Sequence, residues 1–117
     1  SGFLERVFDL KARGTTVQRE VTAGIVTVFI KHTTASVMII EDEPGIRVDT
    51  KSFWDRVIPA DSGLQHNTRN PGEDNGHSHL RGQLQGPSIV IPFIDRALVL
   101  GTWQQIVVVD FDTRART

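Results

Sequence analysis

The chain has 117 residues, no cysteine, and a net charge of −1 from 13 basic and 14 acidic side chains. This length predicts a single domain, residues 1–117. The balanced charge argues against nucleic-acid binding, and the lack of cysteine excludes disulfides and thiolate metal ligands. Apolar runs of three to four residues are too short to cross a membrane, and no signal-peptide pattern opens the sequence. We therefore expect a soluble cytoplasmic protein.

The first half of the chain predicts three strands. Phe8 to Arg13 alternates apolar and charged residues, which is typical of an edge strand. Gly24 to Lys31 is rich in β-branched residues and apolar at both alternating positions, so it predicts a central strand buried on both faces. Ala35 to Ile40 predicts the third strand, after a break at His32-Thr33-Thr34.

A long helix follows these strands. Pro44 is suited to the first turn of a helix, Asp42 to the N-cap, and Pro59 to the end. Apolar residues recur at helical spacing and predict the buried face. They are Ile46, Phe53, Trp54, Val57 and Ile58.

The second half predicts a loop, a short helix and three strands. Asp61 to Gly76 is polar and without periodicity, and a loop of this length in a small domain is either functional or disordered. Ser78 to Gln85 predicts a short helix. Ser88 to Phe93 and Ala97 to Leu100 predict a hairpin, and Trp103 to Phe111 a last strand. The sum is an α+β fold with about six strands, mainly antiparallel, and two helices.

Four motifs occur in a fixed order along residues 24–110. They are His32-Thr33-Thr34-Ala35, the turn Ile40-Glu41-Asp42, the set His66, Asp74 and Ser78-His79, and Ser88 to Pro92 followed by Leu98 to Gln104. In this order they resemble the YjbQ family, sometimes labelled secondary thiamine-phosphate synthase. The resemblance implies an α+β domain that assembles as a homotrimer with sites near subunit contacts.

Three departures from the family pattern stand out. The segment before Gly24 is short for the helix that the family places there, and the chain ends at Thr117, where the family continues into another strand. Arg96 replaces the glycine of the hairpin turn. The first two departures concern the edges of the fold and leave the four motifs intact.

The chain has four histidines, His32, His66, His77 and His79. Imidazole serves as metal ligand, proton carrier or phosphate donor near neutral pH. Three neutral imidazoles with an open position suit Zn²⁺. The spacing alone leaves a shared metal site and unrelated loop histidines both open. The resemblance implies a divalent metal, Zn²⁺ first and Mg²⁺ second, held by His32, His66 and His79, with His77 outside the ligand set.

Three residues are candidates for catalysis. His32 stands on a family motif position, and Glu41 and Asp74 are acidic residues that can orient a metal ligand or act as general base. Glu41 has a second interpretation, in which its charge only favours the start of the following helix.

Five further residues are candidates for substrate binding. The hydroxyls of Thr33 and Thr34 can donate to a phosphate, although ordinary backbone bonding explains them equally well. Arg81 is suited to a phosphate or to a solvated helix surface. Trp103 is expected in the core, with the neighbouring Thr102 and Gln104 facing the pocket.

These residues allow three functions. The resemblance implies a transferase that joins a pyrimidine methyl pyrophosphate to a thiazole phosphate, which requires stabilisation of the departing pyrophosphate. The second is a metal-dependent hydrolase that uses the same histidines. The third is a non-catalytic oligomer that binds metal or ligand. We expect a small phosphorylated ligand, and neither nucleic acid nor membrane as partner.

Overall fold

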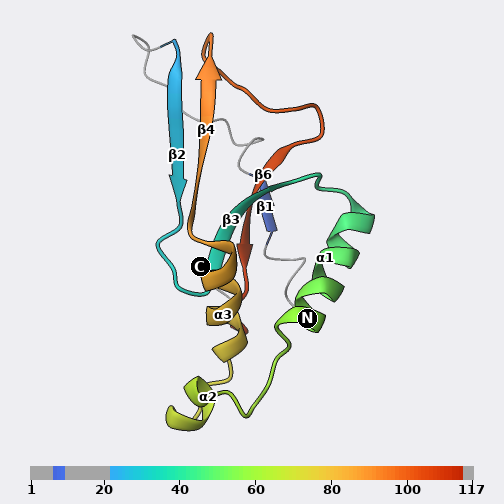
Figure 1. The fold of residues 1–117 in the computed structure, drawn as a ribbon, viewed down its shortest axis with the longest axis vertical. Helices are drawn as coiled ribbons and strands as arrows, with labels where there is room; N and C mark the ends of the chain where they lie inside the picture. The colour runs from blue at the N-terminus through green and yellow to red at the C-terminus, as the bar shows by residue number, and fades with distance from the viewer. Residues whose placement is uncertain (1–6, 10–21, 115–117) are drawn as a thin grey trace.

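The computed structural model describes residues 7–9 and 22–114, which form six strands and three helices (Figure 1). The strands form two antiparallel sheets of three. One has the order β1-β6-β3, built from Val7–Asp9, Gln105–Asp110 and Ala35–Ile40. The other has the order β2-β4-β5, built from Gly24–Phe29, Ser88–Ile94 and Ala97–Leu98. The predicted α+β class with antiparallel pairing is confirmed. Residues 10–13 of the predicted first strand lie outside the described residues.

Helix α1, Pro44–Val57, begins where the sequence predicts, but its cap differs. Glu43 is the N-cap, and its carboxylate accepts the N–H groups of Gly45 and Ile46. Asp42, the predicted cap, instead forms an ion pair with Arg47 in the first turn of the helix. The carboxylate one residue nearer the helix reaches the free N–H groups, so the prediction of Asp42 as cap was wrong.

The polar segment after α1 contains two helices. Helix α2, Gln65–Arg69, lies inside the stretch predicted as a loop, and α3, Gly76–Gln85, begins two residues before the predicted start. Helix α2 was missed because it has no buried residue, and the start of α3 was placed two residues late because its first turn contains Gly76. The segment is therefore ordered, and it presents His66 and His79 from two helices.

Side-chain alternation in β3 places two apolar clusters on opposite faces of its sheet. Met38 belongs to the first cluster, which α1 covers with the buried ring of Trp54. The other members of this cluster are Val107, Val109 and Phe111. Val37 belongs to the second cluster, with Ile106 and Ile91. Because Ile91 comes from β4, this cluster joins the two sheets.

Two burial predictions were wrong. Among the described residues, strand β2 lies at the edge of its sheet and not at its centre, with Ile25 and Phe29 68% and 63% exposed. Trp103, expected in the core, is 72% exposed, because β6 begins only at Gln105. On α1 the predicted apolar face is only partly buried: Trp54 is 4% exposed, but Phe53 is about half exposed.

The predicted hairpin between β4 and β5 is confirmed. Its two turn residues, Asp95 and Arg96, both have positive φ, at 52° and 64°. Two-residue turns of this kind match the twist of the strands, although asparagine and glycine are the usual residues there.

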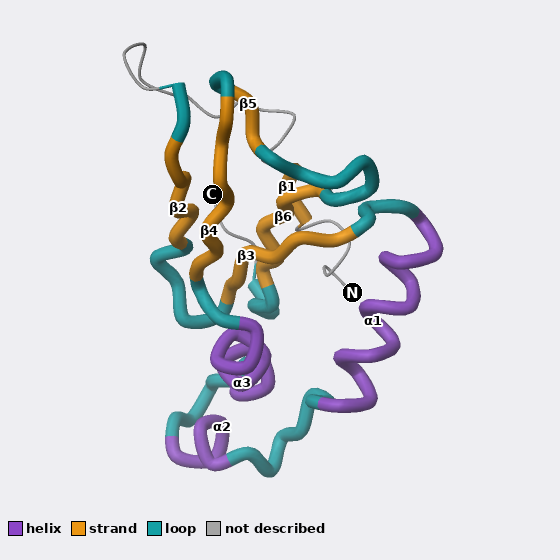
Figure 2. The backbone as a smooth tube through the Cα atoms, turned by 45° about the horizontal axis from the view of Figure 1, so that its top comes forward, coloured by secondary structure: helices purple, strands orange, loops and turns teal. Residues whose placement is uncertain are grey.

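The molecule is elongated, with extents of 52 × 29 × 23 Å. Figures 1 and 2 show the reason: β2 and β4 project as an arm away from the helices. The radius of gyration is 16.2 Å, compared with about 13 Å for a compact chain of this length. Within the described part of the chain, no helix is both long and apolar enough to span a membrane.

Candidate histidine site

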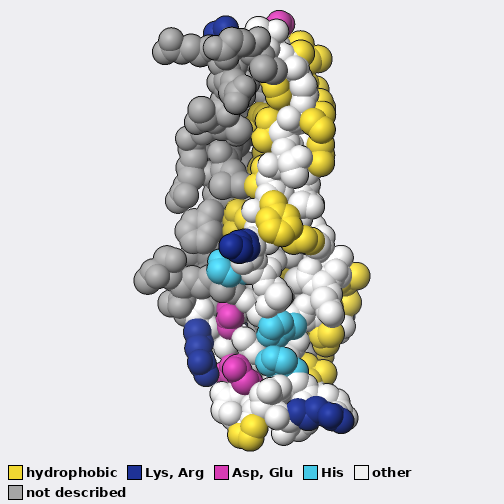
Figure 3. All heavy atoms as spheres, turned by 90° about the vertical axis from the view of Figure 1, so that its left-hand side faces the viewer, with side chains coloured by type: hydrophobic (Ala, Val, Ile, Leu, Met, Phe, Trp, Pro, Cys, Tyr) yellow, Lys and Arg dark blue, Asp and Glu magenta, His cyan; other side chains and the backbone are white. Residues whose placement is uncertain are grey.

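Helices α2 and α3 bring two of the predicted metal ligands together. The ring centroids of His66 and His79 lie 4.5 Å apart, with the ring planes tilted by 43°. Figure 3 shows histidine side chains gathered on one face of the molecule, with acidic side chains beside them. Thirteen positions separate the two residues in the sequence, so their meeting depends on the packing of the short helix against the longer one.

Asn67 orients His66. Its Oδ1 accepts the Gly76 N–H at 2.9 Å and its Nδ2 donates to the Asp61 carbonyl at 3.2 Å, so both ends of the amide are assigned by backbone partners. His66 Nδ1 lies 3.2 Å from the same Oδ1 and must therefore be the donor. In the neutral ring this leaves Nε2 with a free lone pair for a metal or a proton.

His79 also lines a pocket of about 520 Å³, a volume suited to a small-molecule ligand. His32 and Thr33 lie on the wall of this pocket, which extends to the apolar side chains of Phe29 and Pro87. His32 and His79 therefore line the same pocket, and His66 lies against His79 from the other helix. His79 connects the two groups.

The electrostatic environment keeps His79 neutral. Burial lowers the pKa of His79, and the neighbouring His66 lowers it further, while Asp112 and Glu73 act in the opposite direction. A neutral imidazole has a lone pair to offer and no charge of its own. Such a ring is a ligand for cations and not an anchor for anions.

Asp112 is a residue that the sequence analysis missed. Its carboxylate accepts hydrogen bonds from Thr34 Oγ1 at 3.1 Å and from Asn75 Nδ2 at 3.2 Å. Burial raises the pKa of Asp112, but these bonds and those from the backbone outweigh it, so the pKa is lowered. The signal was the pairing of Ala35 with Asp110, which places the end of β6 beside the start of β3 and hence beside the His32 motif.

Thr34 is 4% exposed, and its hydroxyl is bonded to Asp112. Thr33, in contrast, lies exposed at the pocket wall. Of the two predicted phosphate donors, only Thr33 therefore has an accessible side chain in this arrangement.

Three predicted site residues lie at the other end of the sheet. Glu41 follows the end of β3, and the pairing of Ile40 with Gln105 brings Thr102 and Gln104 to the same end. The six residues of β3 span about 20 Å, so this group does not meet the histidines of its own chain. Gln104 Oε1 accepts the Gly101 N–H at 2.8 Å, which closes the turn before β6.

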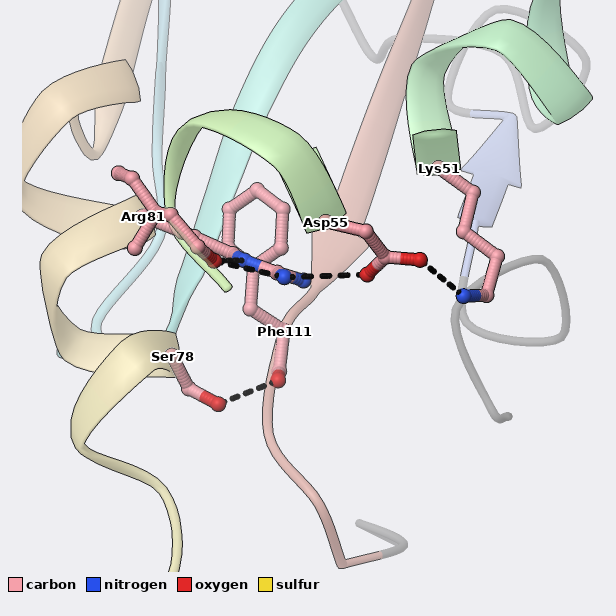
Figure 4. A network of polar contacts seen from close by, with 6 residues as sticks. Lys51, Asp55, Ser78, Arg81 and Phe111 are labelled. Atoms are coloured by element: carbon pink, nitrogen blue, oxygen red, sulfur yellow. Dashed lines mark hydrogen bonds and ion pairs between the residues drawn. The ribbon is translucent and has the colours of Figure 1, made fainter. Parts of the chain in front are cut away.

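Arg81 joins two helices (Figure 4). Its Nε and Nη2 donate to the Ile58 carbonyl at 3.0 and 2.8 Å, and Nη2 lies 3.3 Å from Asp55. The residue is 6% exposed. The guanidinium thus holds the end of α1 to α3, and on the same turn of α3 Ser78 donates to the Phe111 carbonyl of the segment after β6.

Asp74 and His77 lie together in a second pocket, which Asp61 and Glu73 also line. Asp74 accepts the Thr113 hydroxyl at 2.7 Å. His77 is 7% exposed, and its Nδ1 has no hydrogen-bond partner among the described residues. Burial lowers the pKa of His77, and Arg81 lowers it further.

The histidines fit a metal ion only in part. The rings of His66 and His79 lie in contact, whereas no three His, Cys, Asp or Glu side chains of the described residues are arranged to hold an ion. A tetrahedral zinc site with three protein ligands is therefore not assembled within residues 7–9 and 22–114.

Comparison with known proteins places the chain in a family. A family model described as UPF0047 protein YjbQ-like matches residues 10–117. The chain belongs to this family. A UPF0047 protein of Archaeoglobus fulgidus is 36% identical over 89 residues, which cover 76% of the chain and 68% of the relative. A UPF0047 protein of Methanothermobacter thermautotrophicus is also 36% identical over 89 residues, but these cover only 60% of its length.

Solved structures of UPF0047-like proteins have the same fold. A YbjQ-like protein of unknown function from Sulfolobus solfataricus matches 91% of the chain and 76% of its own length, with a TM-score of 0.81 and 28% identity. A protein of the yjbq/upf0047 family from Clostridium acetobutylicum matches 91% of the chain and 81% of its own length, with a TM-score of 0.78 and 30% identity. The resemblance read from the four motifs is confirmed as family membership.

Proposed function

We propose that this UPF0047 chain binds a divalent cation through His66 and His79, Zn²⁺ first and Mg²⁺ second, beside a pocket for a small phosphorylated molecule. The observation that supports this proposal is the 4.5 Å contact between the two rings, one of which lines the pocket. A bound cation would supply the positive charge that attracts a phosphate.

The charge state of the pair favours a cation over a bare anion. The lowered pKa of His79 favours a neutral ring near pH 7. Burial and repulsion from His66 both oppose protonation of His79. Nε2 of His66 has a free lone pair in the tautomer that Asn67 selects. Imidazole nitrogens are among the preferred ligands of Zn²⁺.

His32 is the proposed third ligand. It lies on the wall of the pocket that His79 lines, at the start of the exposed segment before β3. To reach a cation held by His66 and His79, His32 would need only a rotation of its side chain within this pocket, which is a smaller change than any movement of the helices. The role of His32 can be tested separately from the roles of His66 and His79, because a His32→Ala variant leaves the other two rings in place.

Calorimetric titration of the untagged chain with Zn²⁺ tests the proposal. We expect His66→Ala and His79→Ala each to weaken binding by more than about 100-fold, the upper range for loss of an outer-shell partner. Gln65→Ala, on the exposed face of α2 beside His66, is the matched control and should bind as the parent does. Unchanged affinity in both histidine variants would rule the site out, and unchanged affinity in His32→Ala would remove only the third ligand.

The reaction proposed from the resemblance is thiamine-phosphate formation from a pyrimidine methyl pyrophosphate and a thiazole phosphate. Product formation that requires Zn²⁺ or Mg²⁺ and is lost in His79→Ala supports it. Phosphate release from either compound alone favours the hydrolase. Binding without turnover leaves a non-catalytic ligand-binding protein.

We also propose that the chain assembles with copies of itself, as a homotrimer. One face of the β2–β4 arm exposes Ile25, Phe29, Val90 and Ile94 at 56–68%, and exposed apolar faces of this kind mark interfaces. A second copy would also bring another Glu41, Thr102 and Gln104. Mass by light scattering should be three times that of one chain, and Ile25→Lys should lower it, whereas Leu84→Lys, equally exposed on α3, should not.

A further inference from the structure

We propose that the pocket lined by three carboxylates and the ring of His77 binds a small organic diamine in its charged form. This acidic pocket is distinct from the pocket that His79 lines, and its ligand requires no metal ion. The proposed function uses none of its carboxylates.

The acidic pocket has a volume of about 640 Å³, which is within the range of small-molecule sites. Asp61 reaches it from the segment after α1, and Glu73 and Asp74 reach it from the segment between α2 and α3. The other lining residues are Ala60, Ser62, Asn67, His77 and Thr113. The described lining therefore contains acidic side chains and neither lysine nor arginine.

The three carboxylates have no cationic partner among the described residues. Asp61 Oδ1 accepts the Gly63 N–H at 2.8 Å, and Asp74 Oδ1 accepts the Thr113 hydroxyl at 2.7 Å. Within the described part of the chain, the second oxygen of each and both oxygens of Glu73 accept no hydrogen bond. The pocket thus offers negative charge and free acceptors, which a positively charged ligand with N–H donors complements.

His77 gives a second and independent indication of a ligand. Its ring lines the same pocket and is only 7% exposed, yet its Nδ1 has no hydrogen-bond partner among the described residues. Buried polar atoms are nearly always hydrogen-bonded, and one that is left unpaired costs free energy. A neutral imidazole with its proton on Nε2 accepts at Nδ1. An N–H group of the ligand is therefore the partner that this ring lacks.

The arrangement of these groups favours an extended organic cation over a metal ion. A metal ion requires its ligands within about 2.0 to 2.6 Å of one point. No three His, Cys, Asp or Glu side chains of residues 7–9 and 22–114 are arranged in this way. A molecule with an ammonium group at each end can instead reach carboxylates that stand apart, and each ammonium has three donors.

Calorimetric titration of the untagged chain with diaminobutane tests the proposal. We expect binding at concentrations up to about 10 mM. Aminobutane, with a single ammonium, should bind about 10-fold more weakly, because it can form only one set of charge-assisted hydrogen bonds. Butanediol, which has no charge, should not bind. Absence of diaminobutane binding, or equal affinity for the diamine and the monoamine, overturns the proposal.

Charge-removing variants locate the site. Asp74→Asn and Glu73→Gln each keep the shape of the side chain and should weaken diaminobutane binding by about 3- to 10-fold, a modest loss because both side chains are exposed and screened by water. Asp49→Asn, at an exposed position of α1 outside the lining, removes the same charge and should bind as the parent does. Unchanged affinity in both pocket variants overturns the proposal.

His77→Phe tests the unpaired nitrogen, because it keeps an aromatic ring and removes the acceptor. We expect an affinity about 10-fold lower, and a smaller rise in Tm on addition of diaminobutane, than in the parent. Unchanged affinity would exclude His77 as a contact and overturn this part of the proposal. If His77→Phe does not fold, the two carboxylate variants decide, since they change exposed side chains.

His79→Ala separates this site from the proposed cation site. It should bind diaminobutane as the parent does, whether or not the parent binds Zn²⁺. Loss of diamine binding in His79→Ala would place the amine in the other pocket and overturn the proposal, whereas a parent that binds diaminobutane but no Zn²⁺ would overturn only the proposed function.

Discussion

Gly82 of α3 and the backbone of Thr33 approach so closely that a Cβ built at Gly82 would lie 2.7 Å from the Thr33 carbonyl oxygen. Real Cβ atoms do not come this near to a backbone oxygen. The absence of a side chain at Gly82 therefore lets the helix that contains His79 pack against the segment that contains His32. The shared pocket depends on this contact.

Gly82→Ala should destabilise the fold in spite of the higher helix propensity of alanine. Propensity alone would favour alanine by about 1 kcal/mol, but relief of the contact with Thr33 requires a backbone shift, and such overpacking costs about 1 to 3 kcal/mol. Urea denaturation measures the difference. Gln83→Ala, one residue along and exposed, serves as control, and a stabilised Gly82→Ala would contradict the packing described.

The two tryptophans should respond in opposite ways to truncation. Trp54 is 4% exposed and packs edge-on against Phe111, so Trp54→Ala should cost about 3 to 5 kcal/mol. Trp103 is 72% exposed, so Trp103→Ala should cost less than about 1 kcal/mol in a single chain. Thermal unfolding of the two variants side by side checks both values. A large loss for Trp103→Ala that vanishes on dilution would instead place Trp103 in a contact between copies.

Arg81 should prove structural. Arg81→Met would leave the Ile58 carbonyl without its two donors, and we expect a loss of about 1 to 3 kcal/mol in the free energy of unfolding. Arg81→Lys should recover only part, because an ammonium lacks the planar fork that places two N–H groups on one oxygen. If instead the stability is unchanged and only phosphate affinity falls, the phosphate-binding role predicted from the sequence is the correct one.

Stability should fall on mild acidification because of His77. Burial lowers the pKa of His77 below the ordinary value of about 6.5, so the unfolded chain binds a proton in a range where the folded chain does not. The stability contributed by His77 is complete above pH about 6.5 and declines as the pH falls from there toward the folded pKa.

Urea denaturation at a series of pH values, with the parent compared with His77→Gln, isolates this contribution. The slope of stability against pH just below about 6.5 should be smaller in His77→Gln, although His79 retains a slope of the same sign. A parent whose stability rises on acidification in this range would contradict the burial of His77.

Local signals in the sequence were enough for most of the fold. The strand Ala35 to Ile40, the helix start at Pro44 and the hairpin around Asp95 follow from alternation, from proline placement and from turn residues. Each of these signals acts over a few residues. The division into two sheets and the edge position of β2 depend on which strands pair, and no local pattern reports that.

The individual site residues could be predicted from the sequence, but their grouping in space could not. His66, His79 and His32 were all chosen, but their grouping into one contacting pair and one neighbour depends on α2, which buries no residue and so has no apolar period. Glu41 and Gln104 were assigned to the same site because sequence order says nothing about the two ends of a strand. Asp112 was missed because, in the sequence, an acidic residue after a strand cannot be distinguished from a solvated residue of any turn.

The projecting arm formed by β2 and β4 has a practical consequence for handling the protein. A body 52 Å long and 23 Å thick sweeps out more volume as it tumbles than a sphere of equal mass. Size-exclusion chromatography calibrated with globular standards will therefore overestimate the molecular mass of the monomer. The number of subunits in this protein should therefore not be inferred from an early elution volume alone.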